Sequence, residues 1–240
     1  MVPEEKALVE KVPVEIEVAY FNLNARRLVL GGVLKGTDGR MVLPSGWLAP
    51  DEEPAEAAER VLRDVTGITT GVHRPRLAGA FVYQGRDEQC LTLTYAVLGT
   101  TPNGWSEDWG NKAAVTTSLA RMRHIVRSHE ATVAALHTVR ALLSEETVAA
   151  RLAPEVAKNR DGLFRLKDLQ TVYEAVLGIR IDPANFRRKV EAAEGFVEVV
   201  DHEEVMAISR PPTITRGRRP TWYRAGRAAR LEPPIRFDRN

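Results

Sequence analysis

The chain has 240 residues, of which 44% are apolar and 28% are charged. This length predicts one large or two ordinary domains, and the composition is that of a globular protein with enough apolar side chains for packed cores. Its one cysteine, Cys90, excludes an internal disulfide framework and favours a reducing compartment. The charged first residues and the lack of an apolar run of about 18 residues indicate neither a signal peptide nor a membrane span. We therefore expect a cytoplasmic protein.

The net charge of +2 hides an uneven distribution along the chain. From Val205 to Asn240 there are nine arginines against Glu232 and Asp238, a local charge of +7, so the rest of the chain carries −5. A basic end on a nearly neutral protein usually binds a polyanion. For the last dozen residues or so, a solvated tail is the alternative interpretation.

The first predicted elements are strands. Residues 14–20 alternate apolar and polar side chains, which is typical of a half-buried strand. A polar turn over 22–27 separates them from a second strand at 28–34. The turn residues 37–39 (TDG) then predict a hairpin leading to a third strand at 41–43.

Residues 46–68 read GWLAPDEEPAEAAERVLRDVTGI and combine a loop with a predicted helix. Pro54 lies near the start of the helix and Gly67 follows its end, as expected for helix termini. Five residues separate Gly46 from Glu52, and seven separate Glu52 from Arg60. Gly67 and the apolar Ile68 complete the pattern. This spacing, together with the preceding LPSGW, resembles the Nudix box. An ordinary amphipathic helix with Ala58, Val61, Leu62 and Val65 in the core is the alternative.

Three positions of this helix depart from the Nudix pattern. The resemblance implies carboxylates at positions 61, 64 and 65, where Nudix hydrolases bind a divalent metal ion that needs hard oxygen ligands. Here these positions hold Val61, Asp64 and Val65, which lie on one face of the helix. We therefore expect no catalytic residues, no metal site and no enzymatic activity.

The next predicted elements are a hairpin and a helical segment. Residues 77–83 and 89–98 read as two strands joined by a polar turn, and this order of strands, box helix and strands is similar to the Nudix fold. Residues 127–157 are rich in helix formers and low in glycine. They predict a helical connector between two domains.

From residue 159 the pattern becomes that of a winged helix. Residues 166–178 form an amphipathic helix that ends at Gly178, and a second helix has Asp182 as its N-cap, Pro183 at its first position and Gly195 at its end. The apolar segments 196–200 (FVEVV) and 205–209 (VMAIS) read as strands, and a basic segment follows. Helix, turn, helix and hairpin is the order of a winged helix-turn-helix domain.

The second of these helices has the side chains that reading a DNA groove requires. Phe186, Val190 and Ala193 recur at helical spacing and are assigned to the core. The opposite face carries polar side chains that can reach base edges and a small one that lets the helix approach DNA, namely Asn185, Arg188, Lys189 and Ala192. Arg187 lies at the margin of this face. A merely solvated polar face is the alternative, but the position after a short helix-turn unit favours DNA.

The basic segment 216–220 (RGRRP) predicts a second contact with DNA. Arginines flanked by Gly and Pro can lie in a narrow minor groove, or they can contact phosphates without sequence preference. Trp222 and Tyr223 follow directly. We expect them to anchor the returning strand to the core instead of stacking on bases.

Three segments give the chain a resemblance to a known family: LQTVYEAVLG at 169–178, NFRRKV at 185–190 and GRRPTWYR at 217–224. With the degenerate box, they resemble the Nudix-related transcriptional regulators of the NrtR type. The resemblance implies an α+β chain in which a Nudix-like α/β/α sandwich precedes a winged helix-turn-helix domain. The predicted domains are a Nudix-like effector-sensing domain at 1–126, a connector at 127–157, a winged helix at 158–230 and a C-terminal tail at 231–240.

Family membership would imply a homodimeric regulator, mostly a repressor, of genes of NAD metabolism. It would bind a palindromic operator in double-stranded DNA and a nucleotide effector such as ADP-ribose, without a cofactor. The residues expected to contact DNA are Asn185, Arg187, Arg188, Lys189, Arg216, Arg218 and Arg219.

The effector contacts are expected at the start of the box and in the first turn. Candidates that could meet a diphosphate or a base are Arg26, Arg27, Ser45, Gly46 and Trp47. For Arg26 and Arg27, a role as turn residues only is the alternative. Ser45 and the bulky Trp47 depart from the usual box, so the effector can differ from ADP-ribose. A Nudix pyrophosphohydrolase with displaced metal ligands, and a nonspecific RNA-binding or scaffold module, are the alternative functions.

Overall fold

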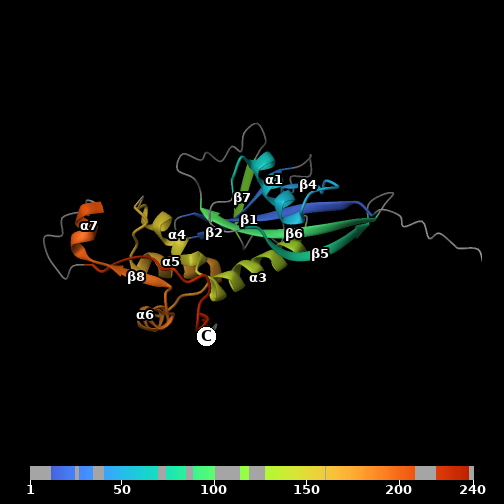
Figure 1. Cartoon of the computed structure of the whole chain (residues 1–240). Coiled ribbons are helices and arrows are strands. Elements are labelled where there is room, and N and C mark those ends of the chain that lie inside the picture. Colours follow the sequence, from blue (N-terminus) through green and yellow to red (C-terminus); the bar gives the residue numbers. More distant parts are fainter. Residues whose placement is uncertain are drawn as a thin grey trace, which may run out of the picture.

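A computed structural model describes residues 12–24, 27–34, 41–69, 74–84, 89–100, 114–118, 128–159, 161–208 and 220–237. The first half of the chain forms a layered structure of strands and helices, and the second half is mainly helical (Figure 1). In the described part of the chain, no helix has both the length and the apolar character that crossing a membrane would need.

The first half contains a mixed sheet of seven strands. Five of them lie in the order β3 (Met41–Val42), β2 (Arg27–Leu34), β1 (Val14–Asn24), β6 (Gln89–Thr100) and β5 (Arg76–Gln84). The two others are β4 (Ser45–Trp47), which pairs with β1, and β7 (Ala114–Ser118), which pairs with β2. β1 and β6 are parallel, whereas the other pairs are antiparallel. The sequence indicated neither β4 nor β7 as a strand.

Helices cover both faces of this sheet, as Figure 1 shows for α1 (Pro54–Thr66) and α3 (His129–Glu145). Ile16, Val18 and Tyr20 of β1 pack with α1. Ala19 and Phe21 point to the other face and join a larger core that includes α3. The prediction of a half-buried strand is therefore wrong for β1, because both of its faces are covered.

The predicted connector consists of two helices with different neighbours. α3 packs on β5 and β6, and α4 (Val148–Ala157) packs mainly on α5 (Leu166–Leu177). One continuous apolar core contains Phe21 of the sheet, Val139 of α3, Leu152 of α4 and Tyr173 of α5. The two halves of the chain thus share a core in this arrangement.

The winged helix is built from α5, α6 (Pro183–Ala192) and the strands β8 (Val197–Val200) and β9 (Trp222–Ala225). β8 and β9 pair antiparallel, and Phe164 extends this small sheet through two backbone hydrogen bonds with Tyr223. The second predicted strand is wrong, because residues His202–Ile208 form helix α7. Acidic residues in its first turn favour a helix there.

The described end of the chain is packed against the protein. Leu231 and Ile235 are only 2% and 1% exposed and belong to the main core. Their backbone N–H groups donate to carbonyls at the end of α3, at Glu145 and Ser144. A solvated tail is therefore the wrong description for residues 231–237, and residues 238–240 lie outside the described part.

Candidate functional site

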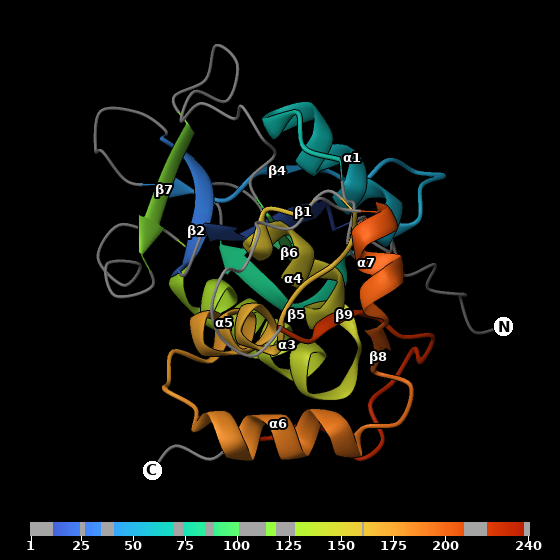
Figure 2. The same ribbon diagram turned by 90° about the vertical axis from the view of Figure 1, so that its left-hand side faces the viewer.

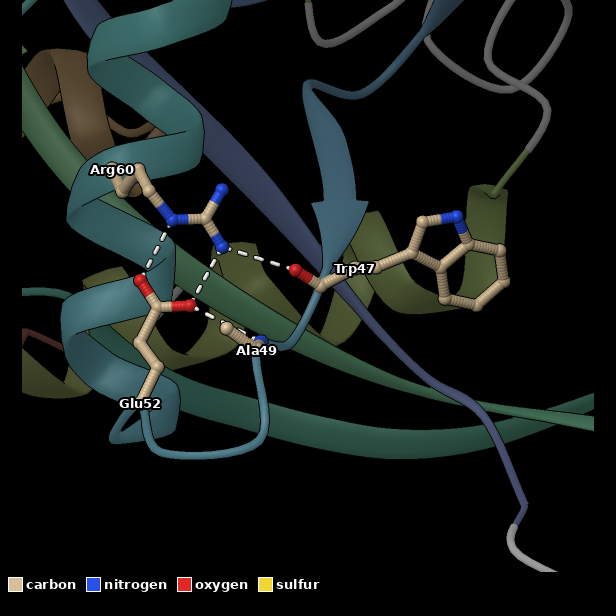
Figure 3. Close-up of polar contacts among 4 residues, drawn as sticks. All are labelled: Trp47, Ala49, Glu52 and Arg60. Atoms are coloured by element: carbon tan, nitrogen blue, oxygen red, sulfur yellow. Dashed lines mark hydrogen bonds and ion pairs between the residues drawn. The ribbon is translucent and has the colours of Figure 1, made fainter.

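A bidentate ion pair holds the loop between β4 and α1. Arg60 donates from Nε and Nη2 to the two carboxylate oxygens of Glu52, both at 2.7 Å (Figure 3). Its Nη2 also donates to the carbonyl of Trp47, and the N–H of Ala49 donates to Glu52. Arg60 holds the pKa of the Glu52 carboxyl below its usual range. The Glu and Arg of the box thus fix the loop, and both oxygens of Glu52 are in use.

The first glycine of the box has a steric role. Gly46 lies in β4 opposite Ile16 of β1, and α1 crosses close to it. A Cβ at this position would lie 3.1 Å from Cγ2 of Val61, closer than ordinary van der Waals contact. Val61 is 2% exposed and belongs to the core under α1. A glycine therefore lets β4 and α1 approach each other.

The three positions that would carry acids in a Nudix hydrolase differ in environment. Val61 is buried, Val65 is partly buried against the same core, and the side chain of Asp64 is 56% exposed beside Arg63. Neither valine offers an oxygen ligand. Among the described residues, no group of three or more His, Cys, Asp or Glu side chains is arranged to hold a metal ion.

The expected effector residues do not all come together. Ser45, Gly46 and Trp47 form β4 and pair with Glu17, Ile16 and Glu15. The Trp47 side chain points away from Arg60, and this residue is 60% exposed (Figure 3).

Arg27 lies at the opposite end of β1 from β4. It pairs with Asn24, which is seven residues along β1 from Glu17, a separation of about 23 Å in a strand. Only the β4 residues can therefore act as one site with the box. Arg26 lies outside the described residues.

The helix expected to read DNA begins where the sequence predicts it, but it ends at Ala192, before the predicted stop at Gly195. The Asp182 carboxylate accepts a hydrogen bond from the N–H of Asn185 at 2.8 Å, which caps the start of α6. Phe186 and Val190 are each 1% exposed and face the core. Arg187 and Arg188 are exposed, and Arg188 donates to the Asn185 side chain at 3.0 Å. The outer face of α6 thus presents an arginine–asparagine pair.

Two side chains of α5, for which the sequence suggested no such role, fix the turn before α6. Gln170 donates to the carbonyl of Ile181 at 2.8 Å, and the Glu174 carboxylate accepts from the N–H of Ile181 at 2.9 Å. Gln170 also donates to Glu174. Both residues belong to the LQTVYEAVLG segment, so a family motif was the only signal for them.

The remaining predicted DNA contacts have different surroundings. The Lys189 ammonium donates to the backbone carbonyl of Arg236 and lies 5.2 Å from the ring centre of Phe237. Lys189 therefore contacts residues near the end of the chain, whereas Arg188 contacts Asn185 within α6. Arg216, Arg218 and Arg219 lie outside the described residues.

The strand after the basic segment is anchored as the sequence predicts. Tyr223 is 6% exposed in the main core, and Trp222 packs against Leu163, Val200 and Val205.

The next residue, Arg224, faces acidic partners. It donates to Glu198 at 3.0 Å and to Glu204 at 2.7 Å, which joins β9 to β8 and α7. This arginine is thus paired within the domain.

A family model described as the NrtR DNA-binding winged helix domain matches residues 161–216. The fold is similar to that of Shewanella oneidensis NrtR, with a TM-score of 0.65, 19% identity, and coverage of 91% of this chain and 97% of that one. The same protein complexed with a 27mer DNA gives a TM-score of 0.60 at 19% identity, covering 88% and 93%. A MutT/nudix family protein from Enterococcus faecalis gives 0.59 at 15% identity, covering 91% and 90%.

No curated protein sequence matches the chain. The family model and the shared fold confirm the resemblance predicted from the sequence, a Nudix-like domain followed by an NrtR-like winged helix.

Proposed function

We propose that the chain is a sequence-specific DNA-binding transcriptional regulator whose affinity for DNA is controlled by a nucleotide metabolite. The observation that carries this proposal is α6, a capped helix with a buried apolar face and an exposed face bearing Asn185, Arg187 and Arg188. It lies within the residues that match the NrtR winged helix model. Arg reaches the acceptors of guanine and Asn pairs with adenine, so this face suits a major groove.

The DNA target we propose is a palindromic operator bound by a homodimer. The similar S. oneidensis NrtR has been solved complexed with a 27mer DNA, which supports a DNA duplex as the ligand. A dimer places two equal α6 helices on two half-sites, so the symmetry of the protein would match that of the operator. By the same resemblance, we propose repression of genes of NAD or related nucleotide metabolism.

A mobility-shift experiment tests DNA recognition. The duplex upstream of the gene that encodes this chain is compared with a shuffled duplex at physiological salt, because electrostatic binding alone is independent of sequence. We expect preference for the upstream duplex. Arg188→Ala should cost about 1–3 kcal/mol at one base position, whereas Arg151→Ala, on the exposed surface of α4, should not change the preference. Equal binding of both duplexes would overturn the proposal.

The effector site we propose is at the box, next to β4. Trp47 offers an exposed ring for a base, and Ser45 and Gly46 lie beside it in the same strand. A metabolite such as ADP-ribose can regulate only if it binds two arrangements of the protein with different affinity. Titration with ADP-ribose, followed by calorimetry, should give binding that Trp47→Ala weakens by about tenfold and that Trp47→Phe retains. Unchanged binding by Trp47→Ala would place the effector elsewhere.

We also propose that the Nudix-like domain does not hydrolyse its ligand. Glu52 is bound by Arg60 at both oxygens, and Val61 and Val65 replace carboxylates of the box. Incubation with ADP-ribose and Mg²⁺ should release no ribose phosphate above the rate without protein. Sustained turnover would support the pyrophosphohydrolase alternative instead.

A further inference from the structure

Residues 231–237, here called the C-terminal strap, lie between the end of α3 and α6. Figure 2 shows this segment, in red, passing alongside α6 towards the end of the chain. Its apolar side chains Leu231 and Ile235 are almost completely buried in the main core. The strap is thus a structural part of the domain that carries α6.

One end of the strap completes the last turn of α3. The final carbonyls of a helix have no partner within it and need one from outside. Here the N–H of Leu231 donates to Glu145 at 2.8 Å and the N–H of Ile235 donates to Ser144 at 2.9 Å. The hydroxyl of Tyr173 in α5 donates to the carbonyl of Leu143 at 2.9 Å. The end of α3 is therefore fixed by the strap and by α5 together.

The other end of the strap contacts α6. The Phe237 ring stacks on Phe186, with 5.9 Å between centres, and meets Tyr173 edge-on at 5.8 Å. Lys189 donates to the Arg236 carbonyl and lies over the Phe237 ring. A small groove of about 170 Å³ remains between Asn185, Lys189, Phe237 and the turn before α6. Phe237 and Lys189 thus tie α6 to the same segment that closes α3.

We propose that the C-terminal strap positions α6 for base recognition, with Phe237 and Lys189 as positioning residues. This inference rests on the proposed binding of DNA through α6. Base recognition is sensitive to orientation, because a bidentate contact requires both hydrogen bonds at once. Lys189 is directed to the Arg236 carbonyl and the Phe237 ring, so base recognition by α6 is left to Asn185, Arg187 and Arg188. α3 also bonds to the sheet through Ser128 and Glu17, which connects α6 with the Nudix-like domain.

Amide hydrogen exchange of the full chain without DNA tests the mechanical part of this proposal. In Phe237→Ala we expect the amides of α6 to exchange at least about tenfold faster, because α6 loses its outer ring contact while α1 is unaffected. Phe237→Tyr keeps the ring and should restore protection. Arg236→Lys keeps both the charge and the carbonyl that Lys189 binds, so it is the matched control and should behave as the unmodified chain. Unchanged exchange of α6 in Phe237→Ala would overturn the proposal.

Lys189→Met gives a second test that leaves the core aromatic rings in place. It retains the aliphatic stem but removes the donor to the Arg236 carbonyl. We expect exchange of α6 to rise severalfold while that of α5 is unchanged. Identical exchange of α6 would show that Lys189 does not hold the helix and would overturn its assignment.

Binding to the upstream and shuffled duplexes tests the functional part. Phe237→Ala should lower the ratio of the two affinities by about tenfold, while affinity for the shuffled duplex stays within about twofold.

Lys189→Met should lower discrimination at several base positions together, since it acts through the whole helix. Loss at a single position would identify Lys189 as a base contact and overturn its positioning role. If the unmodified chain does not discriminate, the proposed function fails, whereas the exchange experiment still decides whether the strap holds α6.

Discussion

Arg60 and Glu52 form a two-bond ion pair across the loop between β4 and α1, with both N–O distances at 2.7 Å. The same guanidinium reaches the Trp47 carbonyl at 3.0 Å, so one side chain connects the strand, the loop and the helix. The box therefore keeps its shape through residues that need no metal ion. This accounts for an ordered loop beside a helix that has valines at two acidic positions of the Nudix pattern.

Removing the carboxylate of Glu52 should destabilise this loop by a modest amount. We expect Glu52→Ala to lower the free energy of unfolding by about 1 kcal/mol, because the Glu52 and Arg60 side chains are 16% and 33% exposed and solvent screens the pair. A double-mutant cycle with Arg60→Ala, measured by urea unfolding, isolates the interaction. Asp51→Ala, at the exposed neighbouring position, is the control. A coupling energy of zero would show that the pair does not hold the loop.

The same pair predicts a pH dependence. Arg60 lowers the pKa of Glu52 in the folded chain, so the stabilisation is fully present above the pKa of an unfolded glutamate, about 4.3. It is lost as the pH falls through the lower, folded pKa. The difference in unfolding free energy between the unmodified chain and Glu52→Gln should therefore shrink below about pH 4. A difference that grows on acidification would contradict this sign.

Gly46→Ala should destabilise the contact between β4 and α1. The new methyl group would lie 3.1 Å from Cγ2 of Val61, which is buried and cannot move freely. Overpacking of this kind costs about 1–3 kcal/mol. The double variant Gly46→Ala with Val61→Ala creates room for the methyl group, so its loss should be smaller than the sum of the two single losses. Additive losses would show that the two side chains do not clash.

Restoring acids to α1 should destabilise the protein by different amounts at two positions. Val61→Glu places a carboxylate in the apolar core beside Ile16 and Leu62, where an unpaired charge is expected to cost about 3 kcal/mol or more. Val65→Glu at the partly buried position should cost about 1 kcal/mol or less, since its carboxylate can reach water. Thermal unfolding of the two variants compares them. Equal stability of the two variants would show that position 61 does not require a buried apolar side chain.

The parts of the fold that local patterns determine could be predicted from the sequence. Asp182, Pro183 and the spacing of Phe186 and Val190 specified the start and the buried face of α6, and the structure has both. The motif residues Gln170 and Glu174 could be recognised but not explained, because their partner is the turn after α5. Their role depends on how the chain folds back on itself.

Other features depend on contacts between distant segments. The sequence of the strap, LEPPIRF, has neither helical nor strand periodicity, so nothing local indicates that Leu231 and Ile235 are buried under α3. α7 was predicted as a strand from its apolar residues, although Asp201 precedes it and its first turn is acidic. The separation of Arg27 from β4 likewise follows from strand register, which the sequence alone did not give.

The burial of Glu17 could not be predicted from the local sequence either, and it affects the stability of the protein. Alternation along β1 placed it on a solvent-facing side, but α3 covers that side and Glu17 is 8% exposed. Ser128 donates to its Oε1 at 2.8 Å, whereas among the described residues Oε2 has no hydrogen-bond partner. Burial raises the pKa of Glu17 above its ordinary value, and the Ser128 hydrogen bond opposes this rise.

Glu17→Gln should therefore stabilise the protein at neutral pH. Because the folded pKa is raised, the folded chain binds more protons than the unfolded chain between about pH 4.3 and the folded pKa, so stability falls as the pH rises through that range. Glutamine keeps an oxygen for Ser128 and removes the buried charge, and we expect a gain on the order of 1 kcal/mol at pH 7. The gain should vanish below about pH 4, where Glu17 is protonated in both states. Urea unfolding at the two pH values, with Glu56→Gln at an exposed position of α1 as the control, measures it. A loss of stability at pH 7 would mean that the charged carboxylate is itself required at this end of α3.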